Sequence, residues 1–164
     1  MGIVSLVLIA AAAIVVSSCE GRAPVPRTVT SESCDAPGVR QVVERLGQHM
    51  KQVSLQAPDS LVAREIRQAY APLVTPALLE AWTSEPTRAP SRDVSSPWPE
   101  RIEIRSVETD ERGLCRVQGE VVYVTSAEVT QGGAAARESV SLFVARLDDG
   151  WRISAYEKAT PLAR

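Results

Sequence analysis

Few side chains in this sequence have the types and spacings that chemistry needs. There is one histidine, and no group of His, Cys, Asp and Glu residues has metal-ligand spacing, so we expect no metal and no other cofactor. Ser139 and Ser141 alternate along an apolar stretch with no acid or base at a fixed spacing, which argues against a serine nucleophile. The remaining candidates are His49 as a general base, three tyrosine hydroxyls and three cysteine thiols.

The first cysteine, Cys19, follows an apolar run. Residues 3–16 carry no charge, and a run of this length fits the apolar core of a signal peptide, whereas a spanning helix needs roughly 20 residues. The sequence VSSC over residues 16–19 resembles the lipobox of bacterial lipoproteins. That resemblance implies a signal peptide over residues 1–18, palmitate-type acylation of Cys19, and the lipid bilayer as a partner. No Lys or Arg precedes the apolar run, which departs from the family pattern, and an uncleaved N-terminal anchor is the alternative.

The segment between Cys19 and the second cysteine is expected to be a tether. Residues 19–34 lack a periodic apolar pattern and are rich in Pro, Ser and Thr. If Cys19 carries lipid, Cys34 and Cys115 remain, and an even remainder in an exported protein favours a disulfide. Two separate buried thiols are the alternative. The expected location is extracytoplasmic, at a membrane.

The composition supports one globular domain over residues 35–164. The net charge is −2 and 45% of the residues are hydrophobic, which is the balance of a folded chain rather than a disordered one. Arginine and lysine are scattered rather than gathered in a block, so nucleic acid is not expected as a partner.

Helical periodicity dominates the first half of that domain. Apolar residues at positions 39, 42, 43, 46, 50 and 53 form one stripe at 100° per residue and predict an amphipathic helix. His49 lies at the edge of this stripe. A second helix is expected to begin at Pro58-Asp59-Ser60 and to end before Pro72. A third is expected after Thr75, which looks like an N-cap, with Pro76 at the first helical position. Residues 83–99 read as a long connection.

The second half alternates with period two, as strands do. Strands are predicted around residues 101–105, 115–123, 140–147 and 151–155, with turns at 131–133 and 148–150. Gly119 is expected to make a bulge or bend. Tyr123 falls on the apolar face of its strand. On the last strand, simple alternation places Tyr156 on the face opposite Trp151 and Ile153.

Helices followed by antiparallel strands indicate an α+β fold, with N-terminal helices packed on a bent four-stranded sheet. Two stretches, DDGWRISAYE at 148–157 and SSPWPERIEI at 95–104, together with this element order, resemble the nuclear transport factor two-like superfamily, also called cystatin-like cones. The second stretch also resembles extracytoplasmic lipoproteins of bacteria. The resemblance implies a cavity between the long helix and the concave face of the sheet.

Enzymes of that superfamily, such as ketosteroid isomerases and polyketide cyclases, use an Asp or His base and a Tyr or acid that stabilises an enolate. The polar candidates for lining the cavity here are His49, Tyr70, Tyr123 and Tyr156. No aspartate falls at an inward strand position, so we expect no catalytic residues. Trp98, between two prolines, is either a contact for a partner or a cover for one end of the cone.

The expected function is therefore a membrane-tethered extracytoplasmic lipoprotein whose domain binds an envelope protein or a small ligand without catalysis. One alternative is an enzyme or small-molecule carrier that uses the cone cavity. Another is a homodimer formed through the sheet face, since apolar residues occur on both faces of residues 140–147.

Overall fold

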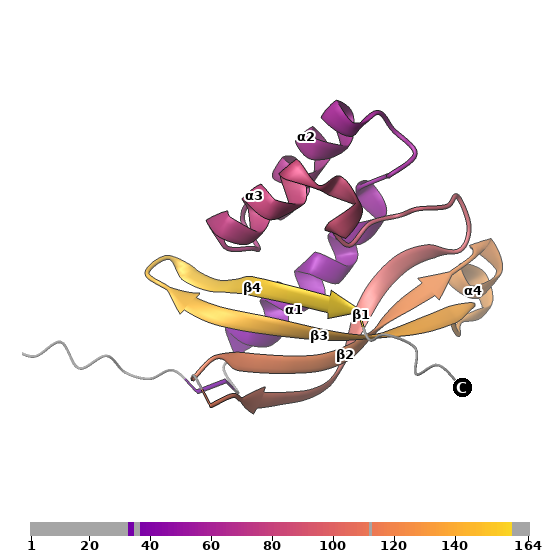
Figure 1. Cartoon of the computed structure of the whole chain (residues 1–164). Coiled ribbons are helices and arrows are strands. Elements are labelled where there is room, and N and C mark those ends of the chain that lie inside the picture. The colour runs from indigo at the N-terminus through magenta and orange to yellow at the C-terminus, as the bar shows by residue number, and fades with distance from the viewer. Residues whose placement is uncertain (1–32, 35–36, 112, 159–164) are drawn as a thin grey trace, which may run out of the picture. The chain divides into compact units, whose positions relative to one another are not determined.

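A four-stranded antiparallel sheet with the order β1-β2-β3-β4 carries the fold (Figure 1). The computed structural model describes residues 33–34, 37–111 and 113–158. The strands are β1 (Trp98–Thr109), β2 (Cys115–Val124), β3 (Ala136–Leu147) and β4 (Gly150–Lys158). Strands that follow one another in the chain are neighbours in the sheet, so the predicted α+β meander is confirmed. The predicted signal peptide, Cys19 and most of the predicted tether lie outside the described residues.

Helix α1 (Pro37–His49) lies across one face of this sheet, here called the inner face (Figure 1). Its buried side is the predicted apolar stripe, including Val39, Val43 and Leu46. Gly47 lets the helix touch the sheet backbone, because a Cβ at this position would lie 2.5 Å from the backbone nitrogen of Ile102. The stripe therefore sets which side of the helix is buried, and one glycine sets how close it comes.

Two further helices, α2 (Asp59–Tyr70) and α3 (Pro76–Ser84), complete the helical layer. The Thr75 side chain accepts a hydrogen bond from the Leu78 backbone nitrogen at 3.4 Å, which confirms the predicted N-cap of α3. The loop before α3 is tied to strand β4: the Ile153 nitrogen donates to the Leu73 oxygen and the Thr75 nitrogen donates to the Ile153 oxygen, both at 2.9 Å. Among the described residues, no helix has the length and apolar character needed to cross a bilayer.

Side chains fill the space between α1, α2 and the inner face. Fully buried residues come from every layer, and those with 0% exposure include Val39, Val43, Leu46, Ile66, Tyr70, Val117, Val121, Leu142, Val144 and Ile153. The continuous packing of this core occupies the place where the superfamily resemblance implied a cavity.

Three local details differ from the sequence-based expectations. The apolar stripe continues to Val53, but α1 ends at His49 and the chain tightens into a short 3-10 helix, η1 (Met50–Gln52). A second 3-10 helix, η2 (Pro86–Arg88), lies inside the predicted long connection. Strand β1 starts already at Trp98, because its pairing with β2 reaches Val124.

Gly119 does not interrupt β2, so the prediction located the bulge in the wrong strand. The irregularity lies in the facing strand, between Ile104 and Ser106 of β1. A Cβ on Gly119 would lie 2.8 Å from the Glu103 carbonyl oxygen. The glycine therefore serves the close approach of β1 rather than a break in its own strand.

A short helix, α4 (Ser126–Gln131), stands between β2 and β3, where only a turn was expected. Thr125 and Glu128 form a capping box at its start: the Thr125 side chain accepts from the Ala127 nitrogen at 3.1 Å, and Glu128 accepts from the Thr125 nitrogen at 2.7 Å. This T-x-x-E signal is readable in the sequence.

Candidate functional site

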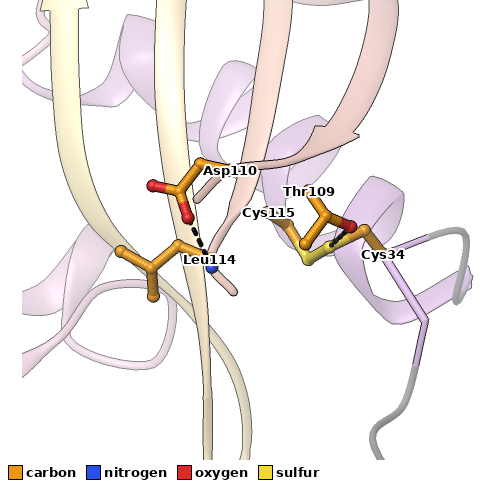
Figure 2. The surroundings of a disulfide bond; sticks show 5 residues. All are labelled: Cys34, Thr109, Asp110, Leu114 and Cys115. Carbon is orange, nitrogen blue, oxygen red and sulfur yellow. Dashed lines mark hydrogen bonds between the residues drawn. A yellow bond between two sulfur atoms is a disulfide. The ribbon is translucent and has the colours of Figure 1, made fainter. Parts of the chain in front are cut away.

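A disulfide joins Cys34, three residues before the start of α1, to the first residue of β2 (Figure 2). The Cys34 and Cys115 sulfurs are 2.11 Å apart and their Cα atoms 5.3 Å apart. The Thr109 hydroxyl donates to the Cys34 sulfur at 3.3 Å. The predicted pairing is confirmed, and both cysteines are buried.

The turn between β1 and β2 holds Cys115 in place. The Asp110 carboxylate accepts a hydrogen bond from the Leu114 nitrogen at 2.8 Å (Figure 2). The Asp110 backbone nitrogen donates to the Leu114 oxygen, also at 2.8 Å. Gly113 has a φ of +77°, a conformation that glycine adopts more readily than other residues. Together these bonds fix the point at which β2 begins.

His49 and Trp98 each have a polar side-chain partner that is not one of the three tyrosines. The His49 Nδ1 atom lies 3.1 Å from the Gln52 side-chain oxygen at the end of α1. The Trp98 Nε1 donates to Glu100 at 3.0 Å, and Glu100 pairs with Lys51 at 2.8 Å. The hydrogen bond from Lys51 is the main cause of the lowered pKa of Glu100, which burial opposes. Trp98 is thus fixed at the start of β1.

Tyr70 and Trp82 of the core form an aromatic row with Tyr156, which packs against them. Tyr70 meets Trp82 edge-on with ring centres 5.4 Å apart, and Trp82 meets Tyr156 edge-on at 6.2 Å. The Tyr70 hydroxyl donates to the Pro90 carbonyl. Burial raises the pKa of Tyr70, so its hydroxyl stays protonated.

Tyr156 lies on the inner face, which corrects the alternation-based placement opposite Ile153. A register shift between Phe143 and Val144 inserts an extra residue in β4, so Ile153 pairs with Val144 while Tyr156 pairs with the buried Leu142. Its hydroxyl oxygen is closed off from solvent and has no hydrogen-bond partner among the described residues. Burial is the main cause of its raised pKa, and the Glu138 charge adds to it.

Tyr123 lines a hollow of about 290 Å³ at the edge of the sheet where β2 ends and β3 begins. Its hydroxyl donates to Glu138 at 2.9 Å, and Glu138 also pairs with Lys158 at 3.5 Å. Burial and this bond raise the pKa of Tyr123. The walls are Asp93, Val94, Pro97, Pro99, Tyr123, Ala136, Arg137 and Glu138.

Glu138 is the acidic residue that the sequence analysis missed. It alternates with Val140 and Leu142 on β3, which puts it on the inner face. Asp93 could not be placed in advance because it belongs to the connection without periodicity. The structure thus brings Tyr123 and Tyr156 near two carboxylates and leaves His49 elsewhere.

The hollow is suited to binding rather than to acid–base chemistry. The Tyr70 and Tyr123 protons are used in internal hydrogen bonds, and the raised pKa values of all three tyrosines oppose their ionisation. Two proline rings and a valine offer apolar contact beside the carboxylates of Asp93 and Glu138. Such walls fit a ligand with an apolar body and a positive group. The described residues contain no group of three or more side chains that could hold a metal.

A larger hollow of about 640 Å³ lies on the outer face, near the disulfide end of the sheet. Phe143 and Ala155 form part of its floor, and Glu108, Asp110 and Glu157 are among its walls. The Arg116 guanidinium lies 5.9 Å from the Phe143 ring centre. The tyrosines do not line this hollow.

The rest of the outer face carries a ladder of ion pairs. Glu103 pairs with Arg101 at 2.6 Å and also with Arg137, while Glu120 pairs with Arg137 at 3.1 Å. Hydrogen bonds from Arg137 and then Arg101 lower the pKa of Glu103 to about 2.

Comparisons with protein-family models, with curated proteins and with solved structures found no match to this chain.

Proposed function

We propose that this protein is an extracytoplasmic lipoprotein, tethered to a membrane through acylated Cys19, whose folded domain binds a ligand without chemistry. The disulfide carries the argument. Structural disulfides persist in oxidising compartments and are rare in the cytosol. Cys34 and Cys115 are joined and buried, and Cys34 is the last residue of the predicted tether.

The binding role rests on how the inner face is used. The core between α1 and the sheet is packed, so a substrate has no room at the site that the superfamily resemblance implied. The hollow beside Tyr123 is open and combines proline walls with Asp93 and Glu138. The proposed ligand is a small molecule or a side chain of an envelope protein that carries an ammonium or guanidinium group.

Lipidation and export are tested by the intact mass of the full chain extracted from bacterial membranes. The expected mass corresponds to loss of residues 1–18, addition of the acyl groups and one disulfide. Cys19→Ala should abolish the lipid, while the matched Cys34→Ser should keep the lipid and lose the disulfide. An unmodified, uncleaved mass would refute the proposal of a lipoprotein.

Binding at the hollow is tested with benzylamine and benzoate, which share an aromatic ring and differ in charge. We expect benzylamine to shift the Tyr123 and Ala136 NMR signals saturably and benzoate to leave them unchanged. Glu138→Gln should weaken the benzylamine effect, whereas Glu44→Gln, exposed on α1, should not. Equal responses to the two probes would contradict a site selective for cations.

A further inference from the structure

A separate hollow of about 240 Å³ lies between the first turns of α1 and the hairpin that joins β3 to β4. Gly38 and Gln41 contribute from the helix, and Trp151 contributes from β4. Three arginines, Arg45, Arg146 and Arg152, also line it. This hollow shares no residue with the one beside Tyr123, so it is a distinct feature of the surface.

Two of the three guanidinium groups converge at the hairpin. A Cβ built on Gly150 would lie 3.2 Å from the Arg152 Nη1 atom and 3.7 Å from the Arg146 Nη1 atom. Gly150 has a φ of +135°, a conformation that glycine adopts readily. The absence of a side chain here leaves the space in which the two positive groups meet.

Packing holds both arginines in these positions. The Arg146 guanidinium lies 5.7 Å from the Trp151 ring centre, a stacked arrangement that orients the group. Trp151 is itself held against α1, because a Cβ on Gly38 would lie 2.5 Å from its Cδ1 atom. The Arg152 side chain is only 19% exposed and donates from Nη1 to the Trp151 carbonyl at 3.0 Å.

Arg152 already binds a carboxylate from its own hairpin. Its Nη2 atom donates to the Asp149 Oδ2 atom at 2.8 Å. The Asp149 side chain is 69% exposed, so it can turn into solvent when another anion takes its place. The contact shows that the Arg152 guanidinium, which lines the hollow, is able to bind an oxyanion.

We propose that this hollow binds a small anion that carries a phosphate group. Guanidinium groups present several donors in a fixed plane and pair bidentately with phosphate oxygens. A tetrahedral phosphate can accept from donors that approach from different directions, as those of Arg146 and Arg152 do, with the exposed Arg45 adding charge at the rim. The phosphate is either that of a free ester or that of a phospholipid head group.

The test is an NMR titration of the full chain in nanodiscs of phosphatidylcholine, with inorganic phosphate as the probe and the three tryptophan indole signals as the readout. The Trp151 signal should shift saturably, while those of Trp82 and Trp98 stay in place. Arg45→Gln should weaken binding about threefold or more, as expected for loss of one exposed charge contact. Asp149→Asn should strengthen binding, because it removes the carboxylate that occupies Arg152.

Two further variants show whether a loss of binding comes from the site itself or from a folding defect. Arg146→Lys keeps the charge but loses the planar fork, and it should also weaken phosphate binding. Arg64→Gln, exposed on α2, is the control and should change nothing. The proposal is overturned when Trp151 shows no saturable shift in either the natural chain or Asp149→Asn, or when Arg64→Gln weakens binding as much as Arg45→Gln.

Nanodiscs that contain phosphatidylglycerol separate the two sources of phosphate, because its head group is anionic, whereas the ammonium of phosphatidylcholine compensates the phosphate charge and competes with the arginines for it. If the ligand is a lipid head group, the Trp151 signal moves without added phosphate, and added phosphate no longer shifts it. If the ligand is a free ester, both kinds of nanodisc give the same starting spectrum and the same titration. Both results support phosphate chemistry, whereas the absence of any response in both kinds of nanodisc refutes it.

Discussion

Removing the hydroxyl group of Tyr70 should reduce stability, whereas removing that of Tyr156 should not. The rings share Trp82 as a neighbour, but their hydroxyls differ. That of Tyr70 donates to the buried Pro90 carbonyl. That of Tyr156 is closed off from solvent and has no partner among the described residues. Phenylalanine keeps each ring and deletes only the polar group.

Tyr70→Phe leaves the Pro90 carbonyl without its donor and should reduce the free energy of unfolding by about 1–3 kcal/mol. Tyr156→Phe removes a buried polar atom that lacks a hydrogen bond, and it should be neutral or raise that free energy by up to about 1 kcal/mol.

The assay is urea unfolding of the full chain and both variants in detergent, followed by far-UV circular dichroism, with the m values compared to check that the transition is unchanged. The two variants should differ by about 1–4 kcal/mol. A loss for Tyr156→Phe as large as that for Tyr70→Phe would show that the Tyr156 hydroxyl is satisfied, and the reasoning would fail.

Three other predictions concern covalent linkage, backbone contact and pH. Replacing Cys34 and Cys115 by serine opens a loop with a sequence separation of 81 and should lower the free energy of unfolding by up to about 4.5 kcal/mol; an unchanged urea midpoint would contradict this. Gly47→Ala drives a Cβ into the Ile102 backbone and should cost about 1–3 kcal/mol, while Gln48→Ala, exposed on the same helix, should leave the midpoint within error. Burial raises the pKa of Tyr70 and of Tyr156 above the usual 10, so the folded state holds these protons more tightly than the unfolded state does. The free energy of unfolding therefore has its full value below pH 10 and falls as the pH rises above it. Urea midpoints at pH 9 and pH 11 should show that fall, and a flat profile would argue against buried tyrosines.

The elements that depend on local pattern could be predicted from the sequence. The stripe from Val39 to Leu46 identified α1 because burial of one helix face repeats every three to four residues. Thr75-Pro76 identified the start of α3 because a cap and a proline act within one turn. The disulfide followed from the number of cysteines and the expected compartment rather than from any geometry.

The candidate site could be predicted only in part, because its shape depends on contacts between distant segments. Tyr156 was placed on the wrong face since a single extra residue in β4 reverses the alternation beyond it. Asp93 and Pro97 lie in a connection whose path is set by packing against β2 and β3, which no local pattern records. Glu138, in contrast, was readable from the alternation of β3.

The Cys34–Cys115 bond also decides how mechanical load would enter the domain. A pull on the chain before Cys34 meets the disulfide before it meets α1, because Cys34 precedes the helix and is bonded to the first residue of β2. Strand β2 is an inner strand, paired with β1 on one side and β3 on the other. The force is therefore shared between two hydrogen-bonded ladders before it reaches α1. Reduction of this one bond would redirect the same load along the helix and onto the packing of the core.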